Sequence, residues 1–111
     1  IMKFRKVTAI IQRDALEKVE QALQGIGVRG ISVTKVKGYG EYANFYSHDW
    51  MVSVSHVRIE IFTEKARVNA IVNAILEAAH MGLPGDGIVV VVPVEQIFRV
   101  RTKSAVAAGE I

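Results

Sequence analysis

The chain has 111 residues, half of them hydrophobic, a formal net charge of +3 and no cysteine. The length fits one domain, and the lack of cysteine excludes disulfides, thiolate metal sites and thiol nucleophiles. No apolar run approaches the roughly 20 residues that span a bilayer, and no signal-peptide pattern opens the chain. We therefore expect a cytoplasmic protein whose surplus apolar surface packs against other subunits.

The first part of the chain has the pattern strand, helix, strand. Apolar and polar residues alternate over 3–12, which predicts a strand, and Ile10 on its second face suggests a second covered surface. Residues 13–27 have one apolar stripe at helical spacing, with glycines near the end. Residues 30–40 return to β-type composition and end in glycines.

The second part repeats this order. Residues 51–62 predict a long strand, and a change in the parity of its apolar positions predicts a bulge near 55–56. Residues 64–82 give the clearest helical spacing in the chain. A turn-rich segment follows at 82–87, and then residues 88–94 form a continuous β-branched run, which is typical of a strand buried on both faces.

This order of elements, βαββαβ, predicts an α+β fold. Two β-α-β halves form a ferredoxin-like split βαβ sandwich, in which an antiparallel sheet carries both helices on one face. We expect a single domain over 2–111. The uncovered sheet face would carry apolar side chains such as Ile10, which favours burial against sister subunits.

The segment between the second and third strands is unusual. It is far longer than the two to five residues of a tight hairpin, and it shows neither a helical nor a strand period. It holds five of the eight aromatic residues, namely Tyr39, Tyr42, Phe45, Tyr46 and Trp50. Two hypotheses stand for it: a loop that contacts another protein, or a loop that folds over its own subunits.

Three features favour an anion site. Gly85, Asp86 and Gly87 form a turn whose backbone N–H groups can approach phosphate oxygens. A second glycine pair ends the strand at 37–40, and two arginines stand at alternate positions in 99–101, where guanidinium groups suit phosphate. Each feature alone is typical of a plain turn or an exposed strand, but together they predict phosphate binding.

Catalysis and metal binding have little support. The histidines, His48, His56 and His80, lack the spacing of a metal site. Ser53 and Ser55 lack the context of a nucleophilic serine, and no pair of residues is spaced for acid–base work. We expect a protein that is not an enzyme and has no resident metal.

Several stretches together resemble the PII signal-transduction family. They are "AIIQRDALEKVEQALQGIGVRGISVTKVKGYG" at 9–40, "HVRIEI" at 56–61 and "GDGIVVVVPVEQIFRVRT" at 85–102. The resemblance implies a divergent PII-like nitrogen regulatory protein. Such proteins are homotrimers that bind adenine nucleotides in the clefts between subunits, and a flexible T-loop engages a partner such as a membrane transporter.

The resemblance also assigns residues. It places the T-loop at about 39–52 and a C-terminal segment at about 95–111, and it implies that Arg99 and Arg101 reach in from the adjacent subunit. Adenine would be held by Ile10, Ser32 and Phe62. The remaining nucleotide-binding positions are Lys37, Gly38, Tyr39, Gly40, His56, Gly85, Asp86 and Gly87, and the partner-binding aromatic residues of the loop are Tyr42, Phe45, Tyr46 and Trp50.

The chain departs from the family pattern at the phosphate end. Glu41 and Tyr42 follow Gly40, where typical members carry a glutamine that helps bind magnesium and 2-oxoglutarate. His56 replaces a basic residue, and Ile88 replaces a lysine. The preference among ATP, ADP and AMP, the part of magnesium and the identity of any further effector therefore stay open.

Two other functions remain as alternatives. A CutA-like metal-associated trimer of the same fold would use His48 or His56 as ligands. A nucleic-acid binder would use two basic clusters, Lys3, Arg5 and Lys6 and then Arg99, Arg101 and Lys103. The modest net charge argues against it, and we expect no nucleic-acid partner. The leading hypothesis is a trimeric, nucleotide-sensing regulator.

Overall fold

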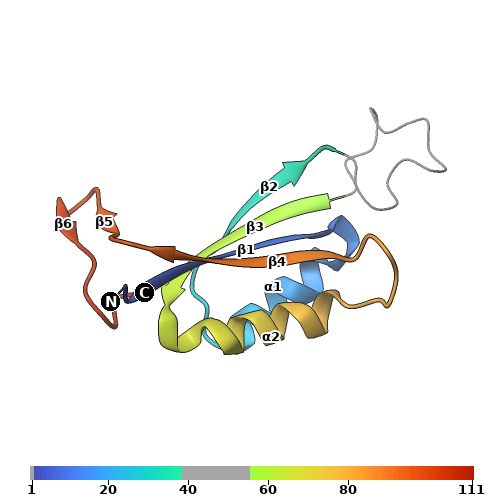
Figure 1. Ribbon diagram of the computed structural model, residues 1–111, viewed down its shortest axis with the longest axis horizontal. Coiled ribbons are helices and arrows are strands. Elements are labelled where there is room, and N and C mark those ends of the chain that lie inside the picture. Colours follow the sequence, from blue (N-terminus) through green and yellow to red (C-terminus); the bar gives the residue numbers. More distant parts are fainter. Residues whose placement is uncertain (1, 39–55) are drawn as a thin grey trace.

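The sheet is antiparallel and has the strand order β2-β3-β1-β4 (Figure 1). The computed structural model describes residues 2–38 and 56–111. The strands are β1 (Phe4–Gln12), β2 (Ser32–Val36), β3 (His56–Glu64) and β4 (Gly87–Val94). The helices α1 (Leu16–Gly25) and α2 (Val68–Ala79) lie together on one face of the sheet (Figure 1). This arrangement confirms the predicted ferredoxin-like βαββαβ fold.

Both helices begin with a 3-10 turn, at Arg13–Ala15 and Lys65–Arg67. In α2 the buried positions Ile71, Ile75 and Ala79 are spaced by four residues, so they form one stripe along the helix. The helix α1 ends at Gly25, close to the predicted end. Among the described residues, no helix is long and apolar enough to cross a bilayer.

The core lies between the sheet and the helices. Successive side chains of a strand point to opposite faces, and the odd-numbered residues of β1 and β3 point toward α1 and α2. These side chains are buried: Val7, Ala9, Ile11, Val57, Ile59, Ile61 and Thr63. The even-numbered residues of the same strands occupy the opposite, uncovered face.

The strand β4 differs from its prediction. It lies at an edge of the sheet, next to β1 alone, and Ile88, Val90, Val91 and Val92 are 37–59% exposed. The prediction of a strand buried on both faces is therefore wrong for the single chain. Its register pairs Val90 with Thr8 and Ile88 with Ile10, so these side chains belong to the uncovered face.

After β4 the chain forms a short hairpin, which the sequence pattern did not predict. The strands β5 (Phe98–Arg99) and β6 (Ser104–Ala105) pair antiparallel. Lys103 has a φ of 57° in the turn between them, and its N–H donates to the carbonyl of Arg99 at 2.9 Å. The hairpin lies at the end of the sheet opposite to the one where β2 ends and β3 begins (Figure 1).

Several predictions fall outside the described residues. They are the T-loop at 39–52, the bulge near 55–56 apart from His56, and the first part of the third strand. The same holds for the site residues Tyr39, Gly40, Tyr42, Phe45, Tyr46 and Trp50, and for His48.

Candidate functional site

The predicted nucleotide-binding residues lie in two groups at opposite ends of the sheet. One group is at the end where β2 leads into and β3 leads out of residues 39–55, and where the turn from α2 enters β4 (Figure 1). This group contains Ile10, Lys37, Gly38, His56, Gly85, Asp86 and Gly87. The other group, Phe62, Arg99 and Arg101, lies toward the β5–β6 hairpin. Ser32 lies between the two, where β2 pairs with Glu60 of β3.

We call residues 81–87 the phosphate loop, because the sequence predicts phosphate binding there. Within it, the Asp86 carboxylate accepts backbone N–H bonds from Met81 at 2.8 Å, Gly82 at 2.9 Å and Leu83 at 3.4 Å. The bond from the Met81 N–H is the main cause that lowers the pKa of the Asp86 carboxyl below its ordinary value, and the other two amides and the charge of His80 act in the same direction. The carboxylate is therefore directed into its own loop, and it shapes that loop.

The glycines of the phosphate loop are required for two reasons, a positive φ and a close approach to the backbone of β1. Gly85 and Gly87 have φ values of 94° and 115°, which side chains rarely adopt. At Gly87 a Cβ atom would also lie 1.8 Å from the carbonyl oxygen of Ile10. Only glycine therefore lets the loop pass close to the backbone of β1 as it enters β4.

Two side chains from the sheet hold the phosphate loop. The Gln12 Nε2 group donates to the carbonyl of Gly85 at 2.9 Å, and the His56 Nε2 atom lies 3.0 Å from the same oxygen. The family resemblance assigned His56 to the site but did not assign Gln12. The register of β1 against β3, which makes these two residues cross-strand partners, was not visible in the sequence.

At the other end of the sheet, a hollow of about 370 Å³ is lined by Phe62, Arg99, Arg101 and apolar residues of the C-terminal segment. The Arg99 guanidinium is held by Glu110, through Nε to Oε2 at 3.3 Å and through Nη2 to the backbone carbonyl at 3.2 Å. Among the described residues Arg101 has no ion pair. The hollow therefore combines one engaged and one unengaged guanidinium with an apolar wall.

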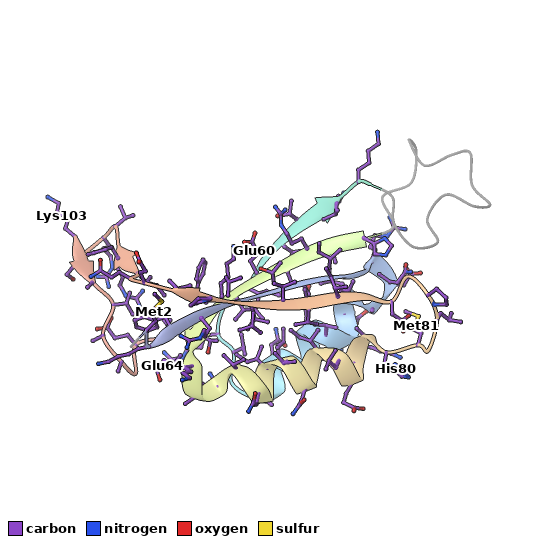
Figure 2. The ribbon with its side chains drawn as sticks, in the orientation of Figure 1. Met2, Glu60, Glu64, His80, Met81 and Lys103 are labelled. Carbon is purple, nitrogen blue, oxygen red and sulfur yellow. The ribbon has the colours of Figure 1, made fainter. Side chains whose placement is uncertain are left out.

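A charged cluster on the uncovered sheet face was also missed. Lys6 Nζ lies 3.2 Å from Glu60 Oε2, and Arg58 Nε lies 3.3 Å from Glu60 Oε1. Glu60 projects from the face that the helices leave uncovered (Figure 2). The three residues lie on the even-numbered side of β1 and β3, next to Phe62, so the cluster separates the two groups of site residues.

The described residues contain no group of three histidine, aspartate or glutamate side chains that would hold a metal ion. Of the two histidines named for the metal-associated alternative, His56 contacts the phosphate loop and His48 lies outside the described residues. The structure thus gives that alternative no observation in its favour.

A model of the family described as "Nitrogen regulatory protein P-II" matches residues 4–104. The chain is 37% identical over 103 residues to the nitrogen regulatory protein P-II of Azospirillum brasilense, which covers 88% of this chain and 92% of the relative. It is 38% identical over 103 residues to the corresponding protein of Cereibacter sphaeroides, with the same coverage.

The fold agrees with these sequence matches. A crystal structure of Arabidopsis thaliana PII bound to citrate superimposes with a TM-score of 0.81 at 36% identity, covering 98% of this chain and 94% of the other. PII proteins act as regulators in signal transduction and are not enzymes. The family match spans both groups of site residues and every strand of the sheet, and the chain belongs to the PII family of nitrogen regulatory proteins.

Proposed function

We propose that this PII protein is a homotrimer that binds an adenine nucleotide, ADP, ATP or AMP, between neighbouring subunits and thereby regulates a partner protein in the cytoplasm. Proteins of this family form trimers and bind adenine nucleotides. One observation carries the proposal. The backbone loop suited to phosphate and the arginine pair suited to phosphate lie at opposite ends of one sheet, so a complete site needs two chains.

The loop end supplies backbone and one cation. Among the described residues, apart from its chain neighbours, no atom lies within 4 Å of the position that a Cβ atom of residue 38 would take, so a ligand can approach the Gly38 backbone closely. Lys37 and the glycines of the phosphate loop lie at the same end of the sheet. Such a combination of amides and a cation suits the diphosphate of a nucleotide.

The hairpin end supplies guanidinium groups and apolar surface. Phe62 is 52% exposed on the uncovered face, so its ring is available to cover an adenine. Arg99 must exchange Glu110 for a phosphate oxygen. Because the Arg99–Glu110 pair is exposed on both sides, it is worth only about 0–1 kcal/mol, and a bidentate phosphate contact replaces it readily.

The number of phosphates bound follows from the cations at the loop end. Ile88, directly after the phosphate loop, offers an apolar side chain that is 59% exposed. His56 is engaged with the Gly85 carbonyl. A third phosphate therefore meets few charges, and we expect ATP to gain little over ADP.

The output of the site passes through residues 39–52, which start directly after Gly38. Tyr42, Phe45, Tyr46 and Trp50 provide large contact area at low cost in side-chain entropy. Nucleotide binding at the base of this segment shifts its population of conformations. The partner that fits this hypothesis is a protein, such as a membrane transporter.

Isothermal titration with ADP, ATP, AMP and GTP tests the proposal. We expect saturable binding of ADP and ATP with one nucleotide per chain and no comparable binding of GTP. Arg101→Ala should weaken ADP binding by about 1.5–3 kcal/mol, because a charge-assisted bond is lost. Lys18→Ala, which removes an exposed cation from α1, should leave it unchanged. A chain that binds no adenylate would refute the proposal.

A further inference from the structure

The peptide group between Gly85 and Asp86 is fixed at both of its polar atoms. Its carbonyl oxygen receives the Gln12 amide at 2.9 Å and faces His56 Nε2 at 3.0 Å. Its N–H donates to the carbonyl of Leu83 at 3.2 Å. A carbonyl oxygen has two lone pairs and only accepts, so His56 donates in the tautomer that carries its proton on Nε2, and both lone pairs are used.

The two side-chain donors come from different strands. Gln12 is the last residue of β1 and His56 is the first residue of β3, and the antiparallel register places them opposite each other. Both hydrogen bonds lie in a partly buried site, where water replaces a lost donor poorly. The loop is thus fastened to two adjacent strands of the sheet through one atom.

The orientation of this carbonyl matters for an anion. The oxygen carries partial negative charge, and rotation of the peptide group would present it to a phosphate bound at the loop. The Asp86 carboxylate controls the other side of the loop by gathering the amides of Met81 and Gly82. Among the contacts of the described residues, the Gly85 oxygen is fixed by Gln12 and His56 of the sheet and by no group of the phosphate loop itself.

We propose that Gln12 is a positioning residue for phosphate recognition: together with His56 it holds the Gly85 carbonyl against the sheet and keeps its negative end away from the nucleotide. This inference rests on the proposed function. Gln12 acts through the loop and needs no contact with the ligand. We therefore expect the loss of Gln12 to weaken the binding of phosphate-bearing ligands more than the binding of adenosine, because the adenine and the ribose are recognised elsewhere.

The first test compares ligands with and without phosphate. Gln12→Met keeps the length of the side chain and removes the donor. We expect ADP affinity, measured by isothermal titration, to fall about five- to tenfold, as for one lost hydrogen bond. Adenosine affinity, measured by displacement of bound ADP, should change by less than about twofold, because adenosine has no phosphate that meets the loop. Equal losses for both ligands would show a merely structural role and overturn the inference.

The second test uses the shared acceptor. In Gln12→Met or His56→Leu one donor remains on the Gly85 oxygen, whereas the double variant leaves that oxygen without either. We expect the fold-loss in ADP affinity of the double variant to exceed the product of the single losses, as for coupled neighbours. If the fold-loss in ADP affinity of the double variant only equalled the product of the two single fold-losses, the inference would be overturned.

The controls separate the two levels of the proposal. If the wild-type chain binds no ADP, the proposed function fails and this inference fails with it. If the wild type binds ADP and Gln12→Met binds it equally well, only the inference fails. Circular dichroism confirms that each variant is folded. If Gln12→Met unfolds, Gln12→Leu replaces it, and equal losses of ADP and adenosine affinity in that variant would overturn the inference.

Discussion

At Gly87 the loop and the sheet come so close together that one residue decides whether they fit. A Cβ atom there would lie 1.8 Å from the Ile10 carbonyl oxygen, at a φ of 115°. Gly87→Ala should therefore lower the free energy of unfolding by about 3 kcal/mol or more, since backbone strain and a backbone clash add. Urea denaturation followed by circular dichroism measures the change.

Gly25→Ala is the matched control. Gly25 is the last residue of α1. Apart from the backbone of its own helix and its chain neighbours, no atom of the described residues lies within 4 Å of the position that its Cβ would take. We expect this variant to be as stable as the wild type or up to about 1 kcal/mol more stable, because alanine favours a helix. Equal stability of the two variants would contradict the close approach at Gly87.

The Asp86 carboxylate makes stability depend on pH. Its amide partners lower its pKa in the folded chain below the ordinary value of 3.8. The unfolded chain therefore binds the proton first, so the stabilisation is complete above about pH 5 and is lost as pH falls below the ordinary value. We expect Asp86→Asn to lower the melting temperature at pH 7, and to lower it less as pH falls below 3.8.

Asp14→Asn, in the exposed 3-10 turn before α1, is the control for this experiment. At pH 7 the melting temperature of Asp14→Asn should differ from that of the wild type by much less than the melting temperature of Asp86→Asn does. A gap between wild type and Asp86→Asn that stays constant down to pH 3 would contradict the role assigned to the carboxylate.

The contacts of Gly87, Asp86 and Gln12 could not be predicted from the sequence. The glycine-rich turn predicted a phosphate site because glycine permits close approach, and the structure adds that Gly87 is required by β1 itself. Asp86 was grouped with the same site, but its side chain is used by the loop. Gln12 was missed because its partner, the Gly85 carbonyl, is a backbone atom 73 positions away in the chain.

Among the elements, the helices and the strand β4 were predictable, but the burial of β4 was not. The four-residue spacing of buried positions in α2 is visible in the sequence as a repeat of apolar residues. The β-branched run of β4 lacks alternation, so its pattern does not tell which face is covered. The β5–β6 hairpin was invisible because two-residue strands have no period, and a lysine gives no hint of a positive φ.

The exposed apolar residues of β4 lead to a prediction at this scale. Val90 is 41% exposed on the uncovered face of the sheet, and Leu76 is 51% exposed on α2, on the helix side. If the uncovered face is the trimer interface, Val90→Lys buries a charge there and should dissociate the assembly. Leu76→Lys should leave it intact. Sedimentation equilibrium distinguishes the two, and identical masses would place the interface elsewhere.

For the whole molecule, the question is whether two ends of different chains form one site. Arg101→Ala damages only the hairpin end. Gly38→Glu damages only the loop end. Among the described residues, apart from its chain neighbours, no atom lies within 4 Å of the position of the new Cβ atom, and the new carboxylate repels phosphate. Each variant alone should form trimers that bind ADP weakly.

Mixed trimers of these two variants should regain binding. Around a ring, each mixed trimer contains one interface where the intact loop end of an Arg101→Ala chain meets the intact arginines of a Gly38→Glu chain. Refolding the two variants together and titrating with ADP should therefore reveal one site of native affinity per mixed trimer. Chains that each carry a complete site cannot repair one another in this way.

A mixture of Arg101→Ala with Arg99→Ala is the control, because both substitutions damage the same end and no interface becomes intact. If this mixture regained binding as well as the first, recovery would reflect the refolding itself. If neither mixture did, while wild-type chains bind ADP, the phosphate loop and the arginines would belong to separate sites. Recovery in the first mixture alone follows only when a neighbour lends its guanidinium groups.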